Sequence, residues 1–380
     1  HQTMTPTYPL GSLFALLMSG YYFFYFAGVG VYVIFTPKVL TELGYTAFEV
    51  GIIYMAAPFM RFLLPFAFRH LLVLTPKIYI LSLFFTLLAS LLFITTAHSF
   101  WLYLLANLFF GAAVGISLPY VETIALSSLQ QSDYGKVRLW GSLGFTSIAL
   151  WLGRVLETPE QAFYYLCSVS FVTLLFGAIL VRYDQPSHNS IESDKSFSLS
   201  RYWAFWLSAF LMQVGFGGFY NFFTIYESEH GVSLEMISWM WSFGVFCEIV
   251  MLYFQGPLLR RNLLRILQFA MLVTALRWTM LWLYPDSLLL TFVSQSLHAV
   301  SFALYHTAAI TYVYALYTQK KLAQQFFLGV AFGLGGSVGA LLSGKLYGEH
   351  LFLYEAMITL LGVGALLIHQ KRKERGVTDV

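Results

Sequence analysis

Charged residues are scarce in this chain of 380 residues: they make up 10% of it, whereas a soluble globular protein carries about 25%. This deficit excludes an ordinary water-soluble protein, a disordered chain and a nucleic-acid binder, because the last needs clustered cations to neutralise phosphates. Cysteine is scarce as well. Cys167 and Cys247 lie in apolar runs at no metal-binding or redox spacing. We therefore expect no metal site and no cofactor, and we interpret both cysteines as small buried apolar residues.

Long apolar runs are abundant instead. Hydrophobic residues make up 58% of the chain, and a run of about 20 of them can cross a hydrocarbon core about 30 Å thick. We count twelve such runs, so the sequence predicts an all-α membrane protein with twelve transmembrane helices. The runs lie near residues 13–35, 50–68, 78–97, 101–126, 139–156, 162–181, 202–224, 236–255, 266–283, 287–312, 326–346 and 353–369.

Lys and Arg are distributed unevenly between the connections. The even-numbered connections and the C-terminal tail hold most of them, whereas the other side holds Lys38, Arg154 and Lys345. Cytoplasmic loops carry the excess of positive charge. The distribution therefore predicts a multi-pass protein of the inner (cytoplasmic) membrane with both termini in the cytoplasm.

One polar stretch, residues 182–201, divides the chain into halves of similar size. It is rich in Ser, Asp and Glu and is typical of a linker. We expect an N-terminal six-helix bundle over residues 1–181, a cytoplasmic linker over 182–201, and a C-terminal six-helix bundle with a short basic tail over 202–380.

An internal repeat supports this division. Residues 65–72 share a Pro, an Arg and two Leu with residues 257–264, at an offset of 192 positions. Gly-Ser-Leu-Gly at 141–144 recurs as Gly-Ser-Val-Gly at 336–339, at an offset of 195. Parallel repeats of six helices are typical of the major facilitator architecture, whose solute site lies between the halves.

Ionisable side chains within the runs are the candidate functional groups, because each costs roughly 3 kcal/mol at a helix centre unless it is paired or hydrated. Glu122 and Arg138 each lie eight residues from a turn expected near residue 130, or about 12 Å along their helices. Arg138 alone fits a cytoplasmic anchor, but a carboxylate at the same depth favours a buried pair. The residues of this class within the runs are Arg61, Glu122, Glu248, Arg277, His298 and His306.

Several of these residues stand in motifs of a known family. The stretch Tyr134 to Phe145, YGKVRLWGSLGF, with Glu122 upstream, resembles the lactose permease and, more closely, the phenylpropionate permeases and nucleoside proton symporters grouped with it. Glu248, Leu276-Arg277-Trp278 and the stretch from Leu297-His298 to Tyr305-His306 are similar to the family's eighth, ninth and tenth helices. The resemblance covers essentially the whole chain.

The resemblance implies roles for matched residues. It implies that Glu122 and Arg138 bind the solute and that Phe145 stacks on it. It also implies that Glu248, Arg277 and His298 belong to a polar cluster for solute binding and proton coupling.

The chain departs from the family in two helices. Ser301 stands where the lactose permease has its proton-carrying carboxylate, and Gln213 and Phe216 stand where the seventh helix of the family has aspartates. This leaves Glu248 as the one acidic side chain expected well within a C-terminal span, and therefore as the candidate proton site.

Further residues are expected near the solute. On a regular helix His298, Phe302 and Tyr305 share a face, with His306 about 80° from His298, and Arg277 favours a neutral imidazole at His298. Arg61 could bind a solute carboxylate, or it could pair with an acidic side chain or a backbone carbonyl of the protein. The sequence favours neither role. An aromatic lining would suit a flat solute, although packing explains many aromatic residues. The additional residues that we assign to solute binding are Trp140, Tyr21, Tyr25, Asn221 and Tyr305.

These expectations favour a monomeric carrier that imports a small organic solute, such as an aromatic acid, a nucleoside or a sugar, together with protons. The partners are then the solute, protons and membrane lipids, with no nucleic acid and no enzymatic activity. The alternatives are an efflux carrier or a uniporter of the same fold, a membrane-embedded acyltransferase that uses His298, and a sensor or scaffold.

Overall fold

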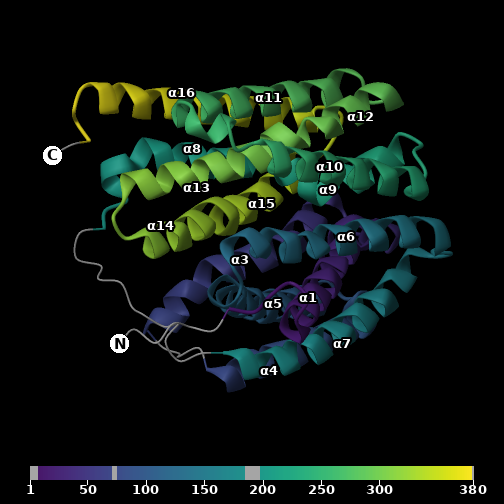
Figure 1. Ribbon diagram of the computed structural model, residues 1–380. Helices are drawn as coiled ribbons and strands as arrows, with labels where there is room; N and C mark the ends of the chain where they lie inside the picture. The colour runs from purple at the N-terminus through teal and green to yellow at the C-terminus, as the bar shows by residue number, and fades with distance from the viewer. Residues whose placement is uncertain (1–6, 71–74, 185–196, 379–380) are drawn as a thin grey trace, which may run out of the picture. The chain divides into compact units, whose positions relative to one another are not determined.

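The computed structural model describes residues 7–70, 75–184 and 197–378, which are almost entirely helical (Figure 1). Leu71 and Leu72 of the sequence repeat, and residues 185–196 of the expected linker, lie outside the described residues. Backbone contacts group the chain into two units. Unit 1 comprises His1–Tyr45 and Phe66–Ile191, and unit 2 comprises Thr46–Pro65 and Glu192–Val380.

In the part of unit 1 that the structure describes there are five long helical segments. In it α1 packs against α6 and α7, while α4 packs against α5 and α7. Side chains cap the starts of two helices, because Ser12 accepts from the N–H of Ala15 and Thr75 accepts from that of Ile78. The segments are α1 (Leu13–Gly30) continued by the π-helical η1 (Val31–Phe35) and α2 (Thr36–Glu42), α4 (Pro76–Thr96), α5 (Phe100–Ser128), α6 (Gln131–Val155) and α7 (Ala162–Leu180).

Unit 2 contains the remaining helices. In it α16 packs against α8 and α11 (Figure 1), and α15 packs against α9. The helices are α3 (Ala47–His70), which belongs to this unit up to Pro65, α8 (Trp203–Gly215), α9 (Gly217–Glu229), α10 (Leu234–Phe254), α11 (Leu263–Leu283), α12 (Leu288–Ser296), η7 (Ala299–Leu304), α13 (Tyr305–Leu316), α14 (Lys320–Phe327), η8 (Leu328–Gly335), α15 (Gly336–Leu346) and α16 (Leu351–Glu374).

The prediction of a twelve-helix all-α membrane protein is confirmed. Ten of the helical segments in the described residues are long and apolar enough to cross a membrane. The other two are α6, which is more polar, and the seventh helix, which is interrupted at Phe216 and so consists of α8 and α9.

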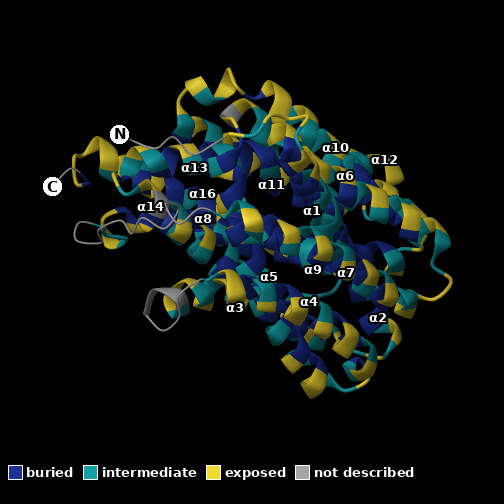
Figure 2. Cartoon of the chain, turned by 60° about the horizontal axis from the view of Figure 1, so that its bottom comes forward, coloured by how far each residue is buried: buried dark blue, intermediate teal, exposed yellow. Residues whose placement is uncertain are grey.

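The surface of α4 shows why the solvent must be lipid. Figure 2 shows both exposed and buried residues along α4. Large apolar side chains are exposed on one face at spacings of three and four residues, whereas Ser82 and Ser90 are buried on the other face together with Leu83 and Phe93. A helix in water buries its apolar face instead. The exposed residues of this stripe are Leu81, Phe84, Leu88 and Leu91.

The C-terminal end of the expected linker packs against the α13–α14 connection, outside the membrane helices. The ring of Phe197 stacks on that of Tyr317 at 4.5 Å, and the Tyr317 hydroxyl donates to the carbonyl of Ser198 at 2.8 Å. Burial raises the pKa of Tyr317 to about 12. The phenol therefore stays neutral at physiological pH and holds the start of unit 2 against the α13–α14 connection.

Candidate functional site

The first candidate cluster surrounds Glu122 in unit 1. Because α5 ends at Ser128 and α6 begins at Gln131, the hairpin brings Glu122 and Arg138 to the same level. Arg138 Nε donates to Glu122 Oε1 at 3.1 Å. The predicted contact between these two side chains is therefore present.

Two tyrosines bind the second oxygen of the same carboxylate. Tyr22 on α1 donates its hydroxyl to Glu122 Oε2 at 3.0 Å, and Tyr134, one turn before Arg138 on α6, donates to the same oxygen. Both were absent from the predicted site. Tyr134 lies within the family motif, and its spacing of four residues from Arg138 is the signal that could have identified it.

Aromatic rings of α1 cover the guanidinium of Arg138. Its Cζ lies 4.1 Å from the ring centroid of Phe26 and 5.1 Å from that of Tyr22. Gly141 allows this approach, since a Cβ there would lie 2.7 Å from the Phe26 ring and 2.9 Å from an Arg138 nitrogen. The cation is thus held between a carboxylate and two π faces, which attract it electrostatically.

The other predicted residues of unit 1 lie at different distances from this cluster. Tyr21 is fully buried and stacks on Tyr25 at 5.7 Å, one helical turn along α1. Phe145 contacts Gly30 further along the α1–α6 contact. Trp140 is 46% exposed and lines a surface hollow with Leu10 and Lys136, so it does not join the Glu122 cluster.

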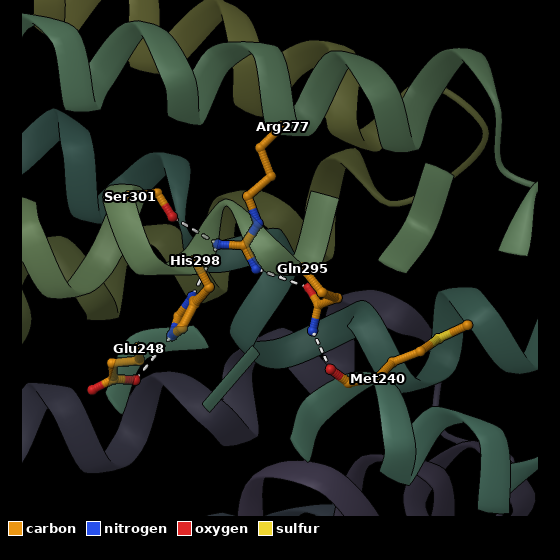
Figure 3. A network of polar contacts seen from close by, with 6 residues as sticks. All are labelled: Met240, Glu248, Arg277, Gln295, His298 and Ser301. Atoms are coloured by element: carbon orange, nitrogen blue, oxygen red, sulfur yellow. Dashed lines mark hydrogen bonds and ion pairs between the residues drawn. The ribbon is translucent and has the colours of Figure 1, made fainter. Parts of the chain in front are cut away.

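The second candidate cluster surrounds Arg277 in unit 2 (Figure 3). The Arg277 side chain is fully buried. Its Nη1 donates to Ser301 at 2.9 Å and contacts His298 Nδ1 at 3.0 Å, while Nη2 donates to Gln295 Oε1 at 2.8 Å. Gln295 in turn donates to the carbonyl of Met240 at 2.9 Å. Ser301, at the position of the family carboxylate, is therefore an acceptor for Arg277, and Gln295 is a partner that the sequence did not reveal.

The hydrogen bonds around His298 determine its tautomer. A guanidinium can only donate, so His298 Nδ1 must accept from Arg277 and carries no proton. His298 Nε2 must then carry the proton of the neutral ring, and it lies 3.4 Å from Glu248 Oε2. The arrangement is a chain from Glu248 through a neutral imidazole to Arg277, as Figure 3 shows.

The tenth helix departs from the predicted face. The rings of His298, Phe302 and His306 form one parallel column, with centroids 5.1 and 5.9 Å apart. The prediction that Tyr305 shares the face of His298 and Phe302, with His306 turned away, is wrong in its placement of His306. The reason is the π-helical turn η7, which adds a residue per turn and which the periodicity of a regular helix does not anticipate.

The remaining predicted residues of unit 2 lie on helices other than α11. Asn221 on α9 donates to the carbonyl of Gly217 at 2.8 Å, and Tyr305 is buried. Arg61 on α3 is exposed. Phe216, at the interruption of the seventh helix, covers the Arg277 guanidinium together with Phe219.

Glu248 was predicted as the one acidic side chain well within a C-terminal span, and a second buried acid lies near the start of α16. Glu355 on α16 is 1% exposed and lies within a segment that can cross a membrane. The sequence placed it too close to the edge of its apolar run to single it out. Among the described residues, no group of three His, Cys, Asp or Glu is placed to bind a metal ion.

Comparison with known proteins identifies the lineage. The sequence model of the MFS_1 like family matches residues 15–356. The chain is 27% identical to the probable 3-phenylpropionic acid transporter of Escherichia coli (strain K12), over 89% of this chain and 93% of that protein. It is 25% identical to the maltose permease of Geobacillus stearothermophilus, over 73% of this chain and 74% of that protein.

A solved structure shares the same fold. The crystal structure of the nucleoside transporter NupG superposes with a TM-score of 0.77 at 17% identity, and the match covers 95% of this chain and 100% of that one. At this identity the likeness concerns the fold alone.

Proposed function

Because the chain belongs to the MFS_1 like family, it is a multi-pass transporter of a small organic solute, and we propose that it imports an aromatic carboxylic acid together with protons. The family consists of transporters, which sets the acyltransferase alternative aside. We further propose that the protein resides in the cytoplasmic membrane as a monomer with both termini in the cytoplasm.

The observation that carries the proposal is the state of the Arg138 guanidinium. Its Nε is bound to Glu122, but its two terminal nitrogens have no hydrogen bond to the described residues. A solute carboxylate can accept two parallel hydrogen bonds from a guanidinium, which is a strong and geometrically specific interaction. The rings of Phe26 and Tyr22 lie against the same cation and offer apolar surface to a solute ring.

The relatives support an aromatic acid within the wider class. The relative with 27% identity is named for 3-phenylpropionic acid, which combines a phenyl ring with a carboxylate. A sugar remains the second candidate, because the maltose permease is also a relative and the hydroxyls of Tyr22 and Tyr134 beside Glu122 would suit a polyol. A nucleoside would use the same rings and hydroxyls.

We assign the coupling proton to Glu248. This carboxylate is about one-fifth exposed and lies beside the Nε2 of a neutral His298, whose other nitrogen is occupied by Arg277. Protonation of Glu248 would remove its charge from a chain that ends at a buried cation. A change of this kind alters the relative free energies of two conformations, which is what coupling in a carrier requires.

Uptake into liposomes tests both parts of the proposal. Purified protein should accumulate labelled 3-phenylpropionate when an inward proton gradient is imposed, and Glu248→Gln should abolish this stimulation while leaving solute exchange intact. Glu235→Gln, an exposed residue of the same helix, is the matched control. Absence of gradient dependence in the parent protein would exclude symport, and would favour a uniporter or, with outward flux, an efflux carrier.

Arg138→Ala should abolish binding of the aromatic acid, whereas Arg154→Ala, an exposed arginine on the same helix, should not. A thermal-shift screen of aromatic acids, nucleosides and sugars measures binding directly, because a ligand of the native state raises its apparent stability. Stabilisation by sugars alone would replace the proposed solute class.

A further inference from the structure

Glu355 lies at the contact between α16 and the interrupted seventh helix. Its side chain packs on Gly218 in the first turn of α9, where a Cβ would lie 3.1–3.2 Å from the Glu355 Cγ, Cδ and Oε1 atoms. Neither carboxyl oxygen has a hydrogen-bond partner in the described part of the chain. The N–H of Gly218 lies near the carboxyl group without the geometry of a hydrogen bond.

The contact around Glu355 is tight because small residues line it. A Cβ at Gly215 would lie 2.4 Å from Thr359 Oγ1, one turn beyond Glu355, and α9 has no side-chain cap at its start. Phe216, which separates α8 from α9, also covers the guanidinium of Arg277. The interruption of the seventh helix therefore touches Glu355 on one side and the Arg277 cluster on the other.

Among the described residues, no charged group is paired with Glu355. The helices packed against α16 are α8, α9, α11 and α15, and none of their titratable or charged side chains pairs with it. On α8 there is none in the described sequence. On the other three helices these groups are Tyr220, Tyr226, Glu227, Glu229, Arg265, Arg277 and Lys345.

An ionised carboxylate in this place would be expensive. Moving an isolated charge out of water costs far more than a protein can supply, so a buried acid without a partner takes up a proton instead. The protonated acid is neutral, and it fits the apolar contact with Gly218 without further partners. The positive end of the helix dipole at the start of α9 provides the nearest stabilisation for the charge if the contact loosens and water enters.

We propose that Glu355 is a second proton-binding carboxylate of this carrier, protonated while α9 packs against α16 and able to release its proton when that contact opens. Its use in transport rests on the proposed proton coupling, but its protonation does not. The interruption at Phe216 then links proton occupancy of α16 to the position of the residues that cover Arg277.

Infrared spectroscopy of the full-length protein in liposomes tests the protonation directly. At neutral pH, Glu355→Gln should remove the C=O stretching band of a protonated carboxylic acid. Glu374→Gln, an exposed residue of the same helix, should remove carboxylate absorption instead. If Glu355→Gln also removes carboxylate absorption and leaves every acid band in place, the residue is ionised and the proposal is wrong.

A second measurement keeps the proposal testable if the Gln variant perturbs the fold. Gly218→Ala retains the acid but crowds it, so the same acid band should shift in frequency, and an unchanged band would contradict the assignment. Glu355→Gln should also unfold at a higher temperature than the parent, by a margin that widens from about pH 5 to pH 8. Only the parent must take up a proton from increasingly alkaline water to bury this side chain.

These outcomes separate the two proposals. Loss of the acid band in Glu355→Gln together with gradient-independent uptake by the parent would retain the proton site and reject symport. Gradient-dependent uptake with an ionised Glu355 would retain symport and reject this site.

Discussion

Gln295 shows how a neutral side chain can determine the state of a buried cation. It accepts from Arg277 Nη2 and donates to the Met240 carbonyl. Gln295→Met keeps most of the volume but leaves a buried donor without an acceptor, at a cost of about 1–3 kcal/mol or more for a charged group. We expect a clear decrease in the thermal unfolding temperature in detergent. Gln325→Met, at an exposed site, should leave it unchanged, and equal effects of the two changes would contradict this role.

Tyr22 contributes two separable interactions to the Glu122 cluster. Tyr22→Phe removes the hydrogen bond to Glu122 but keeps the ring beside Arg138. A hydrogen bond is worth about 0.5–1.5 kcal/mol net, so affinity for the solute should fall about three- to tenfold. Titration calorimetry with 3-phenylpropionate measures this. Tyr164→Phe, exposed on α7, is the control, and an unchanged affinity for Tyr22→Phe would show that Glu122 does not depend on this donor.

Residue-level prediction succeeded where it depended on distance along the chain. Counting eight residues from each side of the turn placed Glu122 beside Arg138, because both helices rise by the same amount per residue. Gln295 and Tyr134 were missed because neutral polar residues are common in helices and carry no comparable signal. Glu355 was missed because it lies near the edge of its apolar run, and the glycine of α9 that it contacts lies far from it in sequence.

At the scale of the element, Gly144 fixes the contact between α1 and α6. A Cβ there would lie 1.9 Å from the carbonyl oxygen of Phe23, which is backbone and cannot rotate away. Gly144→Ala must therefore separate the two helices, and such overpacking costs about 1–3 kcal/mol or more. We expect a lower unfolding temperature and loss of solute binding, because Phe26 and Arg138 lie in the same contact.

Gly135 provides the matched control on α6, since a Cβ there would meet nothing within 4 Å. Gly135→Ala should be neutral or slightly stabilising, because alanine favours the helix by up to about 1 kcal/mol relative to glycine. Thermal unfolding of both variants measures the contrast. Similar effects at the two positions would mean that helix propensity, and not close approach, decides the result.

Helix positions were predictable from hydropathy, but their interruptions were not. Apolar runs report burial in lipid, and ten of the spans satisfy that criterion in the described residues. The seventh helix is interrupted at Phe216, and a π-helical turn follows His298. Neither feature changes the hydropathy of its run, so the faces of the seventh and tenth helices could not be read from the periodicity of a regular helix.

At the scale of the whole molecule, the proposed orientation assigns each loop to one side of the membrane. In a variant with Cys167→Ser and Cys247→Ser, a cysteine introduced by Arg375→Cys should react with a membrane-impermeant maleimide only after the cells are permeabilised. One introduced by Glu349→Cys, between α15 and α16, should react in intact cells. Both positions are exposed, so accessibility within the protein does not limit labelling.

We expect this labelling pattern because Lys and Arg are in excess on the side of the C-terminal tail. This excess favours retention of that side in the cytoplasm. The reverse labelling pattern would place both termini outside. It would also reverse the side of the membrane that lies nearer to Glu355, close to the start of α16, and an inward proton gradient would then reach this residue from the opposite direction.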